Sequence, residues 1–182
     1  MTNRKTRAAG IICGLLMLAC ACAMVYGPAR AQSGERDFLS PAEADKVRNA
    51  PSPDERVRLF ILFAEDRMKK LQYELSSKEA TQNRDVLLNG LLNGYSSCLD
   101  EATDRLQEAK TKGADMRSSV KEMQKQTKLF LDALHKIQND GGENLESFKD
   151  SLGDAIDSTQ DALNEAIKAS KEYGAVPVRR KP

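Results

Sequence analysis

Proline is missing from a long central part of this sequence. The six prolines stand at positions 28, 41, 51, 53, 177 and 182, so residues 54–176 contain none. A proline inside a helix costs about 3 kcal/mol, because it removes a backbone hydrogen bond and clashes with the preceding turn. Its absence over this length permits long helices, and no alternating apolar pattern typical of strands competes with them.

Aromatic and metal-binding residues are also scarce. Tryptophan is absent, aromatic residues make up 5% of the chain, and His135 is the single histidine. Few rings leave few platforms for stacking bases or sugars, and a lone histidine excludes zinc sites built on histidine pairs. A haem held by His135 with Met68 or Met123 is one alternative, but we expect a surface histidine near a helix end. The sequence therefore predicts no metal site and no cofactor.

The common catalytic motifs are missing as well. The chain has no Gly-x-Ser-x-Gly motif, phosphate-binding loop or dinucleotide fingerprint. Residues 118–121 fit Ser-x-x-Lys, but the Ser-Asp-Asn and Lys-Thr-Gly motifs of penicillin-recognising enzymes do not accompany it. We interpret the match as chance, and we predict no catalytic residues and no enzyme activity.

The one long apolar run lies at the N-terminus. Basic residues at positions 4, 5 and 7 precede an uncharged apolar stretch, residues 11–26, and alanines stand at positions 29 and 31. This pattern predicts a secretory signal peptide, residues 1–31, and an exported protein, periplasmic or extracellular. This stretch is shorter than a membrane-spanning helix, which needs about 20 residues. The alternatives are an uncleaved inner-membrane anchor and lipidation at Cys20 or Cys22.

Cleavage of the signal changes the charge and the cysteine content. Removing residues 1–31 from the 182-residue chain leaves 151 residues with 24 basic and 27 acidic side chains, a net charge of −3. This balance favours neither nucleic acid nor an anionic membrane as partner, and no membrane span remains. Cys98 is then the only cysteine, so no internal disulfide forms. We expect it to be buried, and an intermolecular disulfide is the alternative.

The mature chain shows helical periodicity in five segments. A Ser-Pro pair followed by Glu occurs at Ser40 and at Ser52, a capping box that predicts helices beginning at Pro41 and Pro53. The first helix is short, and a weaker repeat of the pattern at Ser76 predicts a break near 76–82. Apolar steps of three and four then predict the set of helices 41–49, 53–75, 83–112, 115–139 and 143–173.

These segments predict an all-α fold. Four long amphipathic helices with short connections favour an antiparallel up-down four-helix bundle, with the short N-terminal helix packed on one end. Residues 32–39 are expected to form a linker, residues 40–174 the helical bundle domain, and residues 175–182 a disordered tail.

Two charged rows predict how the last two helices pair. The basic row is Arg117, Lys121, Lys125 and Lys128, and the acidic row is Asp150, Asp154, Asp157, Asp161 and Glu165. Because a tight turn joins these helices, we expect the rows to lie side by side, where they specify orientation more than stability. The alternatives are a polyanion site on the basic row and a calcium site on the acidic row, although no EF-hand loop is present.

The stretch DVLLNGLLNGYSSCLDEA, residues 85–102, holds two Asn-Gly pairs four residues apart. Asn-Gly is a strong hairpin signal, but the apolar spacing continues through both pairs, which favours helix. Two glycines inside a helix cost about 2 kcal/mol relative to alanine, and a close approach by another group would offset this loss. Gly90, Gly94 and Cys98 are therefore a candidate packing or partner notch, covered by Phe60, by Phe63 or by a partner chain.

One segment carries a family resemblance. Residues 38–71, FLSPAEADKVRNAPSPDERVRLFILFAEDRMKKL, begin with Phe-Leu-Ser before a short helix and continue with Pro-Asp-Glu-Arg at the entry to a long one. This opening resembles that of a group of uncharacterised exported bacterial all-helical proteins. The resemblance covers about a fifth of the chain and implies export and helices, but it implies no activity and no functional residues.

The sequence thus favours an exported, non-enzymatic helical bundle that acts through protein–protein contacts, as an envelope scaffold or adaptor. The expected partner is a protein, either a second copy in a homodimer or an envelope protein, and not nucleic acid. One alternative is a bundle that binds a small apolar ligand or haem. Another is a periplasmic stress chaperone, although the Leu-Thr-x-x-Gln motif of one group of helical chaperones is absent.

Overall fold

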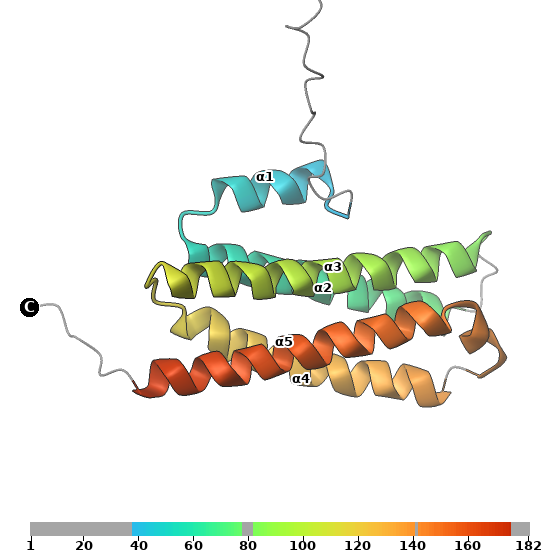
Figure 1. Ribbon diagram of the computed structural model, residues 1–182. Helices are drawn as coiled ribbons and strands as arrows, with labels where there is room; N and C mark the ends of the chain where they lie inside the picture. Colours follow the sequence, from blue (N-terminus) through green and yellow to red (C-terminus); the bar gives the residue numbers. More distant parts are fainter. Residues whose placement is uncertain (1–37, 78–81, 141, 176–182) are drawn as a thin grey trace, which may run out of the picture. The chain divides into compact units, whose positions relative to one another are not determined.

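The computed structural model describes residues 38–77, 82–140 and 142–175. Every regular element in these ranges is helical (Figure 1), which confirms the predicted all-α class. The elements are α1 (Pro41–Asn49), α2 (Pro53–Ser76), α3 (Arg84–Thr111), α4 (Arg117–Asp140), the 3-10 helix η1 (Gly142–Ser147) and α5 (Lys149–Ala175). The predicted signal peptide, most of the predicted linker and nearly all of the predicted tail lie outside the described residues.

The local sequence explains where the first two helices begin. The Ser40 hydroxyl accepts the backbone N–H of Glu43 at 3.3 Å, and the Glu43 carboxylate accepts the backbone N–H of Ser40 at 2.8 Å. This reciprocal pair is the predicted capping box. Ser52 likewise accepts the backbone N–H of Glu55 at 3.1 Å, so both predicted helix starts are confirmed.

The later helices also agree with the sequence predictions, except at the start of the last helix. α3 spans both Asn-Gly pairs as helix, and α2 ends at Ser76 inside the predicted break. Gly113 follows α3 with a φ of 69°, a left-handed conformation that glycine adopts without strain. The predicted start of the last helix is wrong, because η1 precedes α5. A step of three apolar positions, Leu145 to Phe148, fits a 3-10 turn as well as an α-turn.

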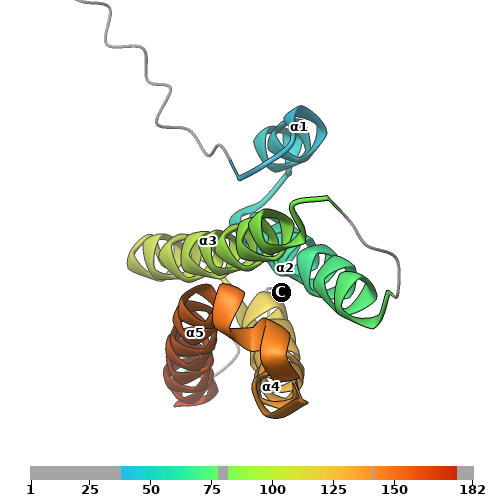
Figure 2. The same cartoon turned by 90° about the vertical axis from the view of Figure 1, so that its right-hand side faces the viewer.

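The four long helices form two hairpins, α2–α3 and α4–α5, stacked as two layers (Figure 2). Between the layers α3 contacts α5. Asn89 bonds to Ser151 at one end of this contact and Lys110 pairs with Glu172 at the other. The residue numbers rise together on both helices, so α3 and α5 run in the same direction.

The other pair of helices between the layers behaves in the same way. Asp54 at the start of α2 accepts the backbone N–H of Ser119 at 2.9 Å, and Arg58 one turn later bonds to Glu122 at 2.7 Å. α2 and α4 therefore also run in the same direction, and Asp54 caps the first turn of α4.

An all-α bundle is therefore confirmed, but its antiparallel up-down arrangement is not. Short connections make the helices antiparallel within each hairpin, whereas the contacts between hairpins join parallel helices. In a simple up-down bundle the helices follow one another around the core in chain order, so that every two adjacent helices are antiparallel.

The short helix α1 lies alongside α2 rather than on the end of the bundle, where the sequence predicted it. It covers the side of the α2–α3 layer that faces away from α4 and α5 (Figures 1 and 2). The reason is a contact with Arg67, which lies well inside α2. Phe38 and Leu39, the end of the predicted linker, also pack against the core.

A single core joins the two layers, and Tyr95 stands at its centre. Its hydroxyl lies 2.7 Å from the Thr159 hydroxyl on α5, and its ring meets Phe130 on α4 edge to face at 5.6 Å. Burial raises the pKa of Tyr95, so its hydroxyl stays neutral. The largest fully buried side chains are Phe60, Ile61, Leu71, Leu88, Leu92, Tyr95, Leu99, Leu106, Met116, Met123, Leu134 and Phe148.

The Tyr95 hydroxyl provides a direct test of the contact between the layers. Tyr95→Phe keeps the ring but removes the buried bond to Thr159, which retains its own bond to the Ala155 carbonyl. We expect a loss of about 1 kcal/mol in the free energy of unfolding, measured by urea denaturation. Tyr73→Phe is the control, because Tyr73 is 69% exposed. An equal loss in both variants would contradict this account.

Candidate functional site

The predicted notch lies on α3, but its three residues have different surroundings. Gly94 and Cys98 are buried, whereas Gly90 is exposed. A Cβ atom on Gly90 would meet nothing within 4 Å, so no group covers this glycine. The notch is thus a site around Gly94 and Cys98, and Gly90 lies outside it.

The group that covers Gly94 is Arg67 of α2. A Cβ atom on Gly94 would lie 3.1 Å from Arg67 Nε and 3.4 Å from Arg67 Cδ. The prediction that Phe60 or Phe63 covers both glycines is therefore wrong. Those two rings are buried and contact each other edge to face, with their centroids 6.3 Å apart.

The Arg67 guanidinium is buried and makes four hydrogen bonds. Nη1 donates to Glu43 Oε1 at 2.9 Å and to the Phe63 carbonyl at 3.0 Å. Nη2 donates to Glu43 Oε2 at 3.1 Å and to the Phe38 carbonyl at 2.6 Å. The paired bonds to Glu43 form a fork, the strong geometry for an arginine and a carboxylate. Arg67 thereby ties α1 and the residues before it to α2, directly over α3.

One carboxylate serves two purposes in this site, because Glu43 also closes the capping box of α1. Burial by itself would raise the pKa of Glu43, but the hydrogen bonds from Arg67 and Ser40 outweigh it and lower the pKa to about 2. The Glu43 side chain is only 17% exposed. A charged Glu43 is therefore part of the folded state at neutral pH.

Cys98 lies fully buried beside this ion pair and is a free thiol. Burial raises the pKa of the Cys98 thiol to about 12, although the charge of Arg67 acts in the opposite direction. The thiolate is the reactive form of cysteine, so Cys98 in the folded protein is an inert apolar side chain. Its burial also opposes the alternative of an intermolecular disulfide.

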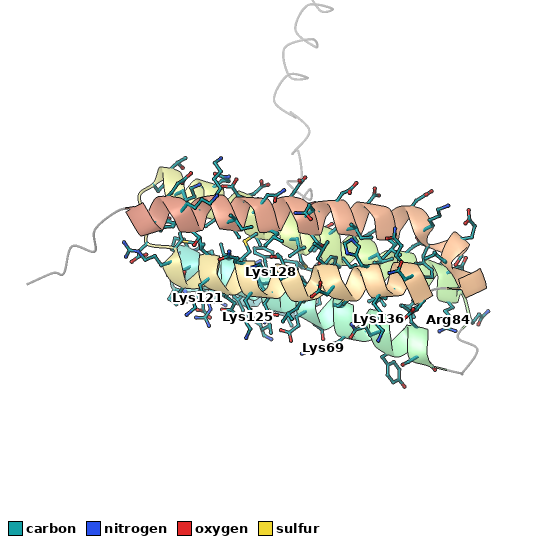
Figure 3. The ribbon with its side chains drawn as sticks, turned by 90° about the horizontal axis from the view of Figure 1, so that it is seen from below. Lys69, Arg84, Lys121, Lys125, Lys128 and Lys136 are labelled. Carbon is teal, nitrogen blue, oxygen red and sulfur yellow. The ribbon has the colours of Figure 1, made fainter. Side chains whose placement is uncertain are left out.

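The basic and acidic rows do not pair within the chain, contrary to expectation. Among the described residues no ion pair joins Lys121, Lys125 or Lys128 to α5, and Glu165 instead pairs with Lys110 of α3 at 3.1 Å. The apolar faces of α4 and α5 both turn towards the core, which leaves the three lysines and the four aspartates of the rows exposed on the outer sides of their helices. Figure 3 shows Lys121, Lys125, Lys128 and Lys136 along the outer side of α4.

The remaining candidates from the sequence do not assemble into a site. His135 is exposed, whereas Met68 and Met123 are buried, so the three do not form a haem ligand pair. In the part of the chain that the structure describes, no three histidine, cysteine or acidic side chains lie close enough together to hold a metal ion. A small pocket of about 50 Å³ opens between the start of α2 and the end of α3, lined by Pro53, Arg56, Arg105, Glu108, Ala109 and Lys112.

Sequence reasoning missed the partnership of Arg67 and Glu43, although a signal was present. Arg67 stands seven residues after Phe60 and four before Leu71, so it occupies a position on the apolar face of α2. A charge at such a position needs a buried partner. In the sequence Glu43 stands out only as part of the capping box.

No described helix combines the length and the apolar character that crossing a bilayer requires. Comparison of the chain with protein-family models, with curated proteins and with solved structures finds no match. The resemblance of residues 38–71 to exported helical proteins therefore stays a prediction.

The two glycines provide a matched pair of substitutions. Gly90→Ala should raise the free energy of unfolding by about 1 kcal/mol, because alanine favours the helix and the new methyl group meets open space. Gly94→Ala should lower it by about 1 kcal/mol, since four hydrogen bonds prevent Arg67 from moving away. Thermal and urea denaturation measure both changes. A gain in both variants would show that Arg67 does not confine Gly94.

The Glu43 pKa predicts a specific loss of stability in acid. A carboxylate with a pKa of about 2 when folded and 4.5 when unfolded stabilises the fold above about pH 4.5, and this contribution disappears as the pH falls from about 4.5 to 2. Wild type should therefore exceed Glu43→Gln by up to about 3 kcal/mol at pH 6 and by less than about 1 kcal/mol near pH 2.5. Urea denaturation at several pH values measures the difference. Glu146→Gln, whose carboxylate is 84% exposed, should show no such convergence.

Proposed function

We propose that this protein is an exported, non-enzymatic helical bundle that works through protein–protein contacts, as an envelope scaffold or adaptor. Its N-terminal 31 residues act as the export signal, and the bundle that follows is the working part. The observation that carries the proposal is the contrast between two parts of the described chain. In the interior, the buried polar side chains have hydrogen-bond partners. On the outer face of α4, the lysines form no ion pair with any acidic side chain that the structure describes.

The interior supports a structural role for the buried polar residues. Among the described residues, every buried side-chain nitrogen or oxygen atom has a hydrogen-bond partner. The Arg67 charge is bound by Glu43, the Tyr95 hydroxyl contacts Thr159, and the Cys98 thiol is protonated. None of these groups is poised to attack or to bind an external substrate.

The surface supports a role in contacts. Lys121, Lys125, Lys128 and Lys136 are exposed on α4, and within the described ranges none of them forms an ion pair. Leu129 lies among them and is 53% exposed, and Leu62 of α2 is 51% exposed. Charge that is not paired within the chain attracts and orients a partner of complementary charge.

A bundle that binds haem or a small apolar ligand is the second candidate function, and the pocket between α2 and α3 in the described part of the chain does not favour it. The pocket of about 50 Å³ at the α2–α3 end is far smaller than the roughly 300 Å³ or more of small-molecule sites. It is lined mostly by charged side chains. A periplasmic chaperone remains an alternative, and protection of an unfolding client protein from aggregation would favour it.

Site-specific photo-crosslinking in the producing cells tests the proposed function. With the crosslinking amino acid at Lys125, we expect a discrete protein adduct in the exported fraction. The matched control places it at Lys46, an exposed lysine on α1, where that adduct should be absent or weak. Cell fractionation in the same experiment measures export.

Two outcomes would contradict the proposal. A visible absorption band in the purified protein, or a small molecule recovered from its organic extract, would favour the ligand-binding alternative. Retention of the protein in the cytoplasmic fraction would remove the exported location and with it the envelope role.

A further inference from the structure

The charged rows that fail to meet within one chain have matching spacing. Lys121, Lys125 and Lys128, here called the basic triplet, are separated by steps of four and three residues. Asp161, Asp157 and Asp154, here called the acidic triplet, show the same two steps when α5 is followed backwards. In an antiparallel pair of helices, Lys125 opposite Asp157 would bring both other lysines opposite aspartates.

Both triplets are available for such a contact. All six side chains are exposed, and within the described residues none of them takes part in an ion pair. The charged side chains that do pair on these helices lie elsewhere. Arg117 binds Asp115 at 3.0 Å, and Glu165 binds Lys110 of α3.

One member of the acidic triplet, Asp161, also lies near acidic side chains of α3. The pKa of Asp100 on α3 is raised, first by burial and then by the negative charges of Asp104 and Asp161, although a hydrogen bond from Ser158 opposes this. A cluster of like charges on the α3–α5 side is relieved when positive charge docks against it. The α4 side carries the complementary positive charge (Figure 3).

We infer that the partner of the outer α4 face is the outer α5 face of a second copy of this chain, docked antiparallel with the basic triplet against the acidic triplet. This inference rests on the proposed function, because it names the protein that is contacted. The contact joins two different surfaces, so it is heterologous, and the pair of copies keeps one free acidic face and one free basic face. Association therefore extends with concentration and weakens with salt.

The same register also brings two like charges together, and this pair distinguishes the register from others. With Lys125 opposite Asp157, Asp132 lies opposite Asp150, and two aspartates repel each other. Asp132→Lys should therefore strengthen self-association severalfold by turning this repulsion into attraction.

Sedimentation velocity of the protein purified from the exported fraction, from micromolar to millimolar concentration at low salt, tests the inference. The basic triplet changed to Glu, and separately the acidic triplet changed to Lys, should each weaken self-association about tenfold or more. An equimolar mixture of the two variants should associate again, because each now carries the charge that the other needs. Circular dichroism checks that both variants remain folded.

The control for the basic-triplet variant makes the same change in net charge, three lysines to glutamate, at positions outside the contact. Lys46, Lys70 and Lys112 are exposed and lie on α1, on α2 and directly after α3. Changing all three to Glu should leave self-association within about threefold of wild type. Equal weakening in this control would attribute the effect to net charge and overturn the inference.

Two further results would overturn it. One is a wild-type protein that stays monomeric at low salt. The other is binding of the basic triplet to phosphatidylglycerol vesicles together with a mixture of variants that fails to associate. If self-association is absent while crosslinking from Lys125 still captures an envelope protein, the inference fails and the proposed function stands.

Discussion

Each of the two hairpins presents one apolar face, and the burial of these faces against each other is the constraint on which the rest of the structure depends. Tyr95 shows the consequence, because its side chain reaches α4 at Phe130 and α5 at Thr159 from the other layer. Stacking hairpin on hairpin makes α3 parallel to α5 and α2 parallel to α4. It also turns the charged sides of all four helices away from the core.

The burial of Arg67 follows from the way α1 returns over the α2–α3 layer. A guanidinium in an apolar position destabilises a fold unless a carboxylate and other acceptors surround it. Glu43 and the carbonyl groups of Phe38 and Phe63 supply those acceptors. The ion pair therefore specifies where α1 lies, and the absence of a side chain at Gly94 leaves the space that the guanidinium stem needs.

The outward charges are what the bundle offers to other molecules. The basic side chains of α2 and α3 mostly have acidic neighbours, as Lys69 has Glu65 and Lys110 has Glu172. Along α4 the lysines form no ion pair among the described residues, so no carboxylate within 4 Å holds their side chains. Specific contacts through these lysines would be sensitive to salt and set more by complementarity than by area.

The sequence by itself determined the elements of this protein. Pro41 and Pro53, each with the serine that precedes it, determined where the first two helices begin. The continuous apolar spacing through Asn89-Gly90 and Asn93-Gly94 determined that this stretch is helix. The sequence also marked Gly90, Gly94 and Cys98 as a place of close packing, which is correct for Gly94 and Cys98 and wrong for the exposed Gly90. These are local properties, since caps and apolar periodicity act within a few residues.

Only the tertiary structure decided which faces meet. The sequence could not show that Arg67 rather than Phe63 covers Gly94, because residues 24 apart in the chain, Glu43 and Arg67, must first be brought together. For the same reason it placed the lysines of α4 against the aspartates of α5 within one chain. Rows of opposite charge with matching spacing attract each other equally well within one chain and between two chains. The burial of apolar surface contributes more free energy than exposed ion pairs do, so it decides which sides of the helices face each other.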